Sequence, residues 1–321
     1  MNYFLIKLAF DSAVHFGTSD SALSLPTAEQ TFRADTLFSA LCHTALSMRG
    51  ESGLYALCEA VSQGDLLFSD AMPWQKETFF LPKPLLPALS EQEIPTALRK
   101  KIKKLAWLPA LSMDDYCRSL AAGRFVPDGI PDCFGTAYEL TKAAVPDGAD
   151  AAPYQVGLFR FAPDCGLYFL CACREEGQME DVMALLTGLG AGGIGGKVSA
   201  GYGRFHIEDS MILNEPFDGQ TQWLYNALCA DKGPYLLLTS SLPKETELDN
   251  AVQGASFQLI RRGGFVAADG ADTPVKKKTQ YFLAAGSVLQ NRFEGDLFDV
   301  SPYGGRPAYR YAKPLLMGVT L

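Results

Sequence analysis

The sequence predicts an α+β protein in which strands and amphipathic helices follow one another. Residues 2–10 are strand-like and mostly apolar, and residues 33–50 and 175–190 carry apolar side chains at helical spacing. Further strand-like runs, separated by Pro, Gly and Asp, fill much of the remaining chain. With 321 residues, the chain is long enough for roughly two domains that each bury a core.

The first predicted helix follows the first strand after a loop rich in Ser, Gly and Thr. Asp35 is a plausible N-cap for it, because its carboxylate can accept hydrogen bonds from the first free amides. Gly50 is predicted to end it. A strand, a long loop and an amphipathic helix in this order indicate a helix that packs on a sheet.

The next regular elements lie between residues 154 and 209. Residues 154–163 and 166–174 are predicted to be two strands of one hairpin, joined by a Pro-Asp-Cys-Gly turn. The helix over 175–190 follows, and residues 204–209 are strand-like again. The resulting order, β-α-β-β-α-β, is that of a ferredoxin-like (RRM-like) domain.

Two domains follow from this order. We predict an N-terminal ferredoxin-like domain over residues 1–210, with an irregular insertion at about 87–153 that mixes a basic amphipathic stretch with Pro, Gly and Asp. Residues 211–321 form a second, strand-rich domain, for which we expect a related topology. Its predicted elements include a strand at 234–242 and a short helix at 244–252.

Composition limits the function. The net charge of −8 argues against a protein that coats nucleic acid indiscriminately, because such binding needs excess Lys and Arg, although a local basic groove remains compatible. The eight cysteines form no C-x-x-C pair, so we expect buried thiols, no metal and no cofactor. No apolar run approaches the ~18 residues of a membrane span, and the N-terminus lacks a signal sequence, which predicts a cytoplasmic protein.

Residues 188–205 read GLGAGGIGGKVSAGYGRF, a segment suited to close approach of a phosphate. It nearly fits both a dinucleotide fingerprint and a P-loop. Both motifs follow a strand and open a helix, whereas these glycines follow a predicted helix and lead into a strand. Ala191 and Val198 also replace the first glycine and the hydroxyl residue that a P-loop needs. A bound mononucleotide or dinucleotide is therefore disfavoured.

The remaining interpretation is a loop that contacts a nucleic-acid backbone. Its backbone amides are unscreened by side chains, Lys197 lies at its centre, and Tyr202 offers a face for base stacking. One or two of the glycines could instead end the preceding helix in a left-handed conformation.

The loop pattern GGxGGKxxxGxGRF, between the last helix and last strand of a predicted ferredoxin-like domain, resembles the signature of the RAMP superfamily of CRISPR proteins. Further stretches narrow the resemblance to the fourth subunit of the type III-A (Csm) interference complex, related to the Cas-five group. They are residues 34–42 (ADTLFSALC), 66–86 (LLFSDAMP and FFLPKPLL), 261–266 (RRGGFV) and 309–319 (YRYAKPLLMGV).

This resemblance implies a non-enzymatic role. A protein of this family is expected to grip the 5′ handle of the mature CRISPR RNA. It is also expected to dock the large polymerase-nuclease subunit and the first backbone RAMP subunit, and to carry a β-hairpin thumb. The irregular segment 87–153 is the candidate for that thumb.

Recognition of single-stranded RNA combines charge on phosphates, hydrogen bonds to splayed bases and stacking on aromatic or Arg side chains. Residues of the glycine-rich loop match the family pattern directly, and Asp35 and Asp70 match it as a helix cap and a turn residue. The predicted RNA-binding residues are Gly192, Gly193, Gly195, Gly196, Lys197, Ser199, Tyr202, Arg204, His15, Phe16, Gly17, Arg33, Lys83, Arg261, Arg262 and Lys313. We expect Lys197→Ala combined with Gly195→Asp to abolish RNA retention and leave the fold intact.

The alternative is a metal-independent endoribonuclease of the same superfamily that processes CRISPR repeat RNA. Such cleavage needs a base for the 2′-hydroxyl and an acid for the leaving oxygen. The histidines available are His15, His43 and His206. We name no catalytic residue, because one histidine near the predicted RNA path is thin support for this chemistry.

Overall fold

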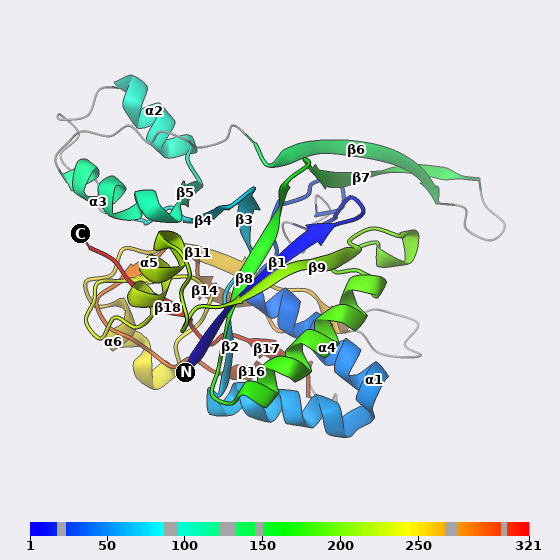
Figure 1. Cartoon of the computed structure of the whole chain (residues 1–321). Coiled ribbons are helices and arrows are strands. Elements are labelled where there is room, and N and C mark those ends of the chain that lie inside the picture. Colours follow the sequence, from blue (N-terminus) through cyan, green and yellow to red (C-terminus); the bar gives the residue numbers. More distant parts are fainter. Residues whose placement is uncertain are drawn as a thin grey trace.

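The computed structural model describes residues 1–17, 24–86, 96–121, 133–144, 150–266, 275–302 and 307–320. Within these ranges, none of the helices has the length and apolar character that crossing a bilayer requires. The protein is a mixed α/β structure built on one large antiparallel sheet (Figure 1).

The central sheet has seven strands in the order β5-β4-β3-β8-β1-β9, and β2 also pairs with β8. Strand β8 is buried along its whole length, which explains why its sequence, CGLYFLCAC, is continuously apolar rather than alternating. The strands are β1 (Asn2–Phe10), β2 (Leu66–Phe68), β3 (Met72–Gln75), β4 (Thr78–Pro82), β5 (Trp107–Pro109), β8 (Cys165–Cys173) and β9 (Phe205–Ile212).

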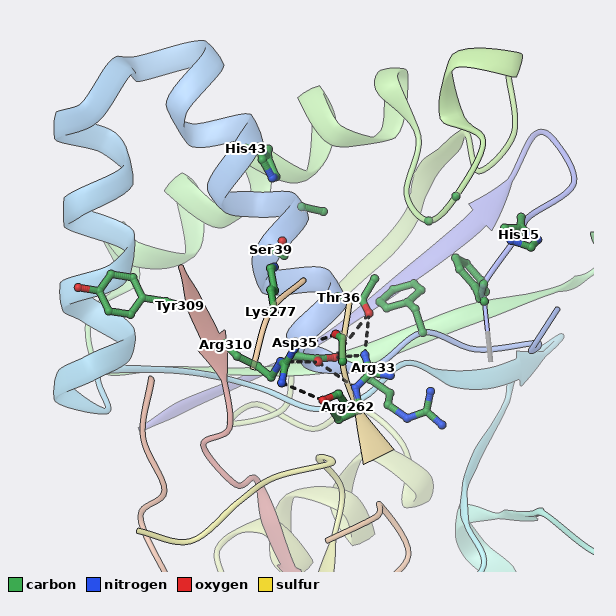
Figure 2. A pocket seen from close by; sticks show the side chains of 17 residues that line it. His15, Arg33, Asp35, Thr36, Ser39, His43, Arg262, Lys277, Tyr309 and Arg310 are labelled. Carbon is green, nitrogen blue, oxygen red and sulfur yellow. Dashed lines mark hydrogen bonds and ion pairs between the residues drawn. The ribbon is translucent and has the colours of Figure 1, made fainter. Parts of the chain in front are cut away.

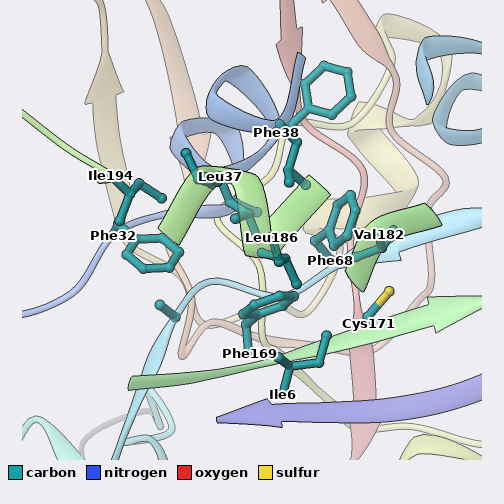
Figure 3. Packing of buried hydrophobic residues seen from close by; sticks show 14 of the residues in the cluster. Ile6, Phe32, Leu37, Phe38, Phe68, Phe169, Cys171, Val182, Leu186 and Ile194 are labelled. Carbon is teal, nitrogen blue, oxygen red and sulfur yellow. The ribbon is translucent and has the colours of Figure 1, made fainter. Parts of the chain in front are cut away.

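Two long helices, α1 (Ala34–Gln63) and α4 (Glu176–Gly192), cover one face of this sheet (Figure 1). The core between them holds Ile6 and Phe169 from the sheet, packed against Phe38 of α1 and Leu186 of α4 (Figure 3). Each side chain of this size contributes about 1.5–3 kcal/mol when it is fully buried. The regularly spaced apolar residues of both helices form the face that packs into this core.

The start and end of α1 differ from the sequence prediction. The N-cap position is Arg33, and Asp35 lies inside the first turn, so the prediction of Asp35 as the N-cap is wrong. The cap comes instead from Asp70, whose Oδ1 accepts a hydrogen bond from the Ala34 amide at 2.8 Å. At Gly50 the backbone leaves the helical region (φ 70°, ψ −165°), which kinks the helix without ending it.

A long hairpin of β6 (Gly135–Ala144) and β7 (Ala152–Phe161) extends away from the sheet (Figure 1). The predicted hairpin between residues 154–163 and 166–174 is therefore wrong in its pairing. Asp164 does adopt a turn conformation (φ 56°), but the edges of β8 are occupied by β1 on one side and by β2 and β3 on the other. Strand β7 pairs with β6 instead.

The predicted irregular insertion contains regular structure. It includes α2 (Thr96–Lys104), β5, a 3-10 turn η2 (Ala110–Ser112), α3 (Met113–Ala121) and β6. Residues 87–95, 122–132 and 145–149 of this segment lie outside the described residues.

The C-terminal third contains a three-stranded sheet, β15-β10-β18, and several two-stranded ladders. Helix α5 was not predicted, although the Asp218 carboxylate accepts a hydrogen bond from the Thr221 amide at 2.7 Å in a capping box that the sequence displays. The elements are α5 (Gly219–Leu228), β10 (Tyr235–Leu237), η4 (Glu245–Glu247), α6 (Leu248–Val252), β11 (Leu259–Arg262), β12 (Phe265–Val266), β13 (Val275–Lys276), β14 (Gln280–Leu283), β15 (Val288–Leu289), β16 (Leu297–Asp299), β17 (Tyr309–Tyr311) and β18 (Leu316–Gly318).

Apolar side chains from the two halves of the chain share their cores. Tyr311 of β17 is buried in the same cluster as Phe38 of α1. Leu236 and Met317 belong to one cluster with Leu5 and Tyr168 of the central sheet. Elements on both sides of residue 210 are thus held together by burial of apolar surface.

Candidate nucleic-acid interface

A pocket of about 370 Å³ lies where the loop after β1, the first turns of α1, the glycine-rich loop and the C-terminal strands meet (Figure 2). Four cationic side chains and one carboxylate line it, in a protein whose net charge is −8. Its lining residues include His15, Phe16, Gly17, Arg33, Gly195, Gly196 and Arg262 from the predicted set, together with Asp35, His43, Lys277, Tyr309 and Arg310. The pocket is thus a local basic site.

The floor of the pocket contains a two-point ion pair. The Arg262 guanidinium donates from Nη2 to Asp35 Oδ1 at 2.7 Å and from Nε to Asp35 Oδ2 at 2.9 Å. The Asp35 side chain is only 8% exposed. Burial alone would raise the pKa of this carboxyl, but the Arg262 charge and hydrogen bonds outweigh it and hold the pKa below its usual range. Asp35 is therefore an ionised partner of Arg262.

Arg310 supports the same turn from below. Its Nη1 donates to the Arg262 carbonyl at 3.0 Å, and its Nη2 donates to the Gly263 carbonyl at 2.8 Å. Its Nε also lies 4.0 Å from Asp35 Oδ2. The guanidinium thus holds the turn that presents Arg262. Sequence reasoning missed Arg310, because in the YRYAKP stretch it singled out Lys313.

Two further cations differ in how strongly they are paired. Arg33 forms a salt bridge with Glu29, with Nη1–Oε2 at 2.6 Å and Nη2–Oε1 at 3.3 Å. Lys277 is half-buried, and its pKa is lowered mainly by that burial and then by the nearby Arg310 charge. An anion placed beside Lys277 would favour the charged ammonium and so oppose both effects on its pKa. The sequence analysis did not name Lys277 as a site residue, although Lys277 lies in a run of three lysines.

His15 joins three parts of the site. Its ring Nδ1 lies 2.7 Å from the Gly157 carbonyl of β7, and because a carbonyl only accepts, Nδ1 carries the hydrogen. Its own carbonyl accepts from the Gly196 amide at 2.8 Å. The residue is 6% exposed. His15 therefore fastens the β6–β7 hairpin and the glycine-rich loop to the end of β1.

The glycine-rich loop follows α4 and leads into β9, as predicted, but many of its amides are not bare. The amides of Gly193, Ile194 and Gly203 donate to the carbonyls of Leu189, Gly203 and Ala13 at 2.7, 2.9 and 2.9 Å. The expectation of a cradle of unscreened amides is wrong for these groups and for the Gly196 amide. The loop is closed by hydrogen bonds of its own chain, and it contributes Gly195 and Gly196 to the pocket lining.

The glycines are needed for this close packing. Gly195 has φ +99°, and a Cβ there would lie 2.7 Å from the His15 carbonyl oxygen. The expectation that Gly195→Asp leaves the fold intact is therefore contradicted, because any side chain at this position collides with backbone. At Gly192, at the end of α4, an added Cβ would meet no atom within 4 Å.

The rest of the loop lies against the β6–β7 hairpin. Lys197 Nζ lies 5.1 Å from the centre of the Tyr154 ring, and Lys142 Nζ lies 4.6 Å from the centre of the Tyr202 ring. Ser199 and Arg204 are exposed in the same loop.

Five predicted basic residues lie outside the pocket lining: Lys197 and Arg204 of the glycine-rich loop, and three that lie elsewhere. Lys83 donates from Nζ to the Ile102 carbonyl at 2.8 Å, and burial lowers its pKa. Lys313 is 5% exposed, and burial lowers its pKa as well. Arg261 lies on β11 opposite Tyr281 of β14. The pocket thus gathers part of the predicted set and leaves these three apart.

Solved structures show what this fold is similar to. A chain in a crystal structure of a Csm1-Csm4 cassette in complex with pppApA matches with a TM-score of 0.63 and 21% identity, covering 100% of this chain and 99% of that chain. A chain in a crystal structure of a Csm3-Csm4 subcomplex in the type III-A CRISPR-Cas interference complex matches with a TM-score of 0.62 and 16% identity, covering 100% of both chains. This protein therefore has the fold of a CRISPR complex subunit.

Sequence relatives identify the family within this class. The chain is 35% identical over 334 aligned residues to the CRISPR system Cms protein Csm4 of Mycobacterium tuberculosis, covering 99% of this chain and 98% of the relative. It is 30% identical to the protein of the same name from Streptococcus thermophilus, with 98% of each chain covered. The family model of the CRISPR Csm4 C-terminal domain matches residues 230–319. The chain belongs to the Csm4 family, which confirms the resemblance drawn from its motifs.

Proposed function

We propose that this chain is a non-catalytic RNA-binding subunit of a type III-A CRISPR effector complex that grips the 5′ handle of the CRISPR RNA. The observation that carries this proposal is the pocket, which gathers Arg33, Lys277 and Arg262 beside Gly195 and Gly196 of the glycine-rich loop. A concentration of cations in an acidic protein favours one local polyanion, and the nearby Tyr154 and Tyr202 rings suit single-stranded RNA.

The order of elements supports a ferredoxin-like domain over residues 1–210. Apart from the elements β4 to β7, which lie between β3 and β8 in the chain, the order is β1, α1, β2, β3, β8, α4 and β9. Strand β1 lies between β8 and β9 in the sheet. We propose that residues 211–321 form the second, strand-rich RAMP-like domain, docked on the first through shared apolar clusters.

The names of the relatives' assemblies support the proposed partners. The two matching structures are described as a Csm1-Csm4 cassette and a Csm3-Csm4 subcomplex. By similarity, we propose that this chain docks the large polymerase-nuclease subunit and the backbone RAMP subunit. Because its proposed ligand is CRISPR RNA, we place the assembly in the cytoplasm.

The histidine geometry favours binding over cleavage. His15 is buried, and its Nδ1 hydrogen is directed at the Gly157 carbonyl. His43 lines the opposite end of the pocket (Figure 2). His206 is hydrogen-bonded to Asp11 and Glu208. A general acid and base must both reach the reacting atoms, which this separation does not favour. Incubation of the purified protein with repeat RNA tests the point: specific cuts that disappear in His15→Ala would support the endoribonuclease instead.

RNA retention by the assembled complex tests the proposed function. The complex is purified with Arg33→Ala and Lys277→Ala combined in this subunit, and its RNA content is measured. A matched control combines Lys103→Ala and Lys104→Ala, which remove the same charge from exposed positions on α2. We expect loss of RNA in the first variant and retention in the control. Equal RNA content in both would count against the pocket as the handle site.

A further inference from the structure

The β6–β7 hairpin and the glycine-rich loop meet through two lysine–tyrosine contacts of reciprocal arrangement. Lys142 of the hairpin lies over the Tyr202 ring of the loop, and Lys197 of the loop lies over the Tyr154 ring of the hairpin. Lys142 and Tyr154 are direct partners in the β6–β7 ladder. Cations and rings therefore alternate across the junction.

The rings of this junction are held from beneath. Tyr154 and Tyr202 both pack against the apolar cluster of Ala13, Val156 and Leu158. The base of the hairpin is pinned beside them, since the amide of Val14 donates to the Phe159 carbonyl at 2.8 Å. The two rings thus share one apolar support.

The backbone of Lys197 adds a second, independent sign. Lys197 has φ 61° and ψ 25°, a left-handed conformation that a residue with a side chain rarely adopts. Such conformations persist where the surrounding structure fixes them, and they concentrate at functional sites. In this conformation the Lys197 ammonium lies over the Tyr154 ring.

We propose that Lys142 and Tyr154 are positioning residues: with Lys197 and Tyr202 they form a cation–π latch that sets the hairpin against the glycine-rich loop before RNA binds. This inference rests on the proposed RNA-binding function. The latch preorganises two ammonium groups and two rings as one surface that spans the junction. A single strand that enters the pocket then continues along it, with its phosphates on the two lysines.

The first test measures the latch without RNA. Amide hydrogen exchange of the full chain is compared among wild type, Tyr154→Leu and Tyr154→Phe. Tyr138→Leu, on the same hairpin, is the matched control. A phenyl ring keeps the cation–π attraction and a leucine does not, so we expect exchange in β6 and β7 to accelerate roughly two- to five-fold in Tyr154→Leu only. Unchanged exchange in Tyr154→Leu would overturn the latch.

The second test measures RNA affinity with a labelled oligouridylate of about ten nucleotides. We expect Tyr154→Leu and Lys142→Met each to weaken binding several-fold, and Tyr154→Phe to bind like wild type. The effects of Tyr154→Leu and Lys197→Met on the binding free energy should be non-additive when the two are combined. Faster exchange with unchanged affinity would overturn the shared RNA surface and leave only a structural contact. If neither the isolated chain nor the assembled complex binds RNA, the proposed function fails, whereas the exchange result still decides the latch.

Discussion

Asp35 of α1 and Arg262 of β11 form a two-point ion pair although they are 227 positions apart in the chain. The pair joins the first helix to the C-terminal strands, and it makes the floor of the basic pocket. Arg310 completes it from the other side through the Arg262 and Gly263 carbonyls. The same contact therefore serves both the packing of the two halves and the presentation of a guanidinium.

We predict that Arg262→Ala lowers the free energy of unfolding by roughly 2–4 kcal/mol, because it leaves the buried Asp35 carboxylate without its main partner. Urea-induced unfolding of the full chain provides the measurement. Arg118→Ala is the control, since its ion pair with Asp115 is exposed (65% and 77%) and screened by solvent, so its removal should cost much less. Equal losses in the two variants would contradict this account of Asp35.

The stability contributed by Asp35 should depend on pH. Its folded-state pKa is depressed by Arg262, so its contribution is present above the unfolded pKa of about 3.9 and is lost as the pH falls through the lower folded value. We expect the difference in unfolding free energy between wild type and Asp35→Asn to shrink as the pH is lowered below about 4.

Asp70 provides a comparison of opposite sign. Burial raises its pKa despite the hydrogen bonds from Ser240 and the Ala34 amide, so its contribution is largest at low pH and is lost as the pH rises through the folded value. The stability difference between wild type and Asp70→Asn should therefore grow as the pH falls. Parallel pH trends for the two substitutions would show that the assigned directions are wrong.

Glycines of the loop should differ sharply in their tolerance of a methyl group. Gly195→Ala should destabilise the protein by roughly 1–3 kcal/mol, because φ is +99° and the Cβ would lie 2.7 Å from the His15 oxygen. Gly192→Ala is the matched control: its Cβ meets nothing within 4 Å, so the change should be within about 1 kcal/mol of neutral. Thermal unfolding of both variants would distinguish them, and similar melting temperatures would argue against packing as the reason for Gly195.

Lys277→Met should weaken RNA binding in a salt-dependent manner. If the ammonium contacts one phosphate, the slope of log affinity against log salt should fall in magnitude by about 0.7, the value for single strands. Lys103→Met on the exposed face of α2 is the control and should leave the slope unchanged. A lowered affinity with an unaltered slope would mean that Lys277 acts through packing rather than through a phosphate.

Sequence reasoning succeeded where the signal is local. The apolar spacing in residues 33–50 and 175–190 placed α1 and α4, and the direction of the glycine-rich loop, from helix to strand, followed from its neighbours. The motifs also identified the family correctly. The prediction of Asp35 as the N-cap of α1 failed because a side-chain cap can come from a residue distant in the chain, here Asp70.

The strand pairing of β7 also could not be read locally. Its sequence and the Asp164 turn suit a hairpin with β8. In the folded sheet, however, β8 pairs with β1 on one edge and with β2 and β3 on the other. Competition among strands for one partner is a property of the whole sheet, and periodicity in a short window does not report it.

By itself, the sequence determined the helices α1 and α4, the strands β1, β8 and β9, the family, and the glycines that allow the loop to turn closely. The tertiary structure alone decided that Lys277 and Arg310 join Arg33 and Arg262 around Asp35, and that loop amides bond to their own chain. The physical reason is that backbone periodicity and turn chemistry act between near neighbours. Ion pairs, pocket charge and burial depend on contacts between residues that only the folded chain brings together.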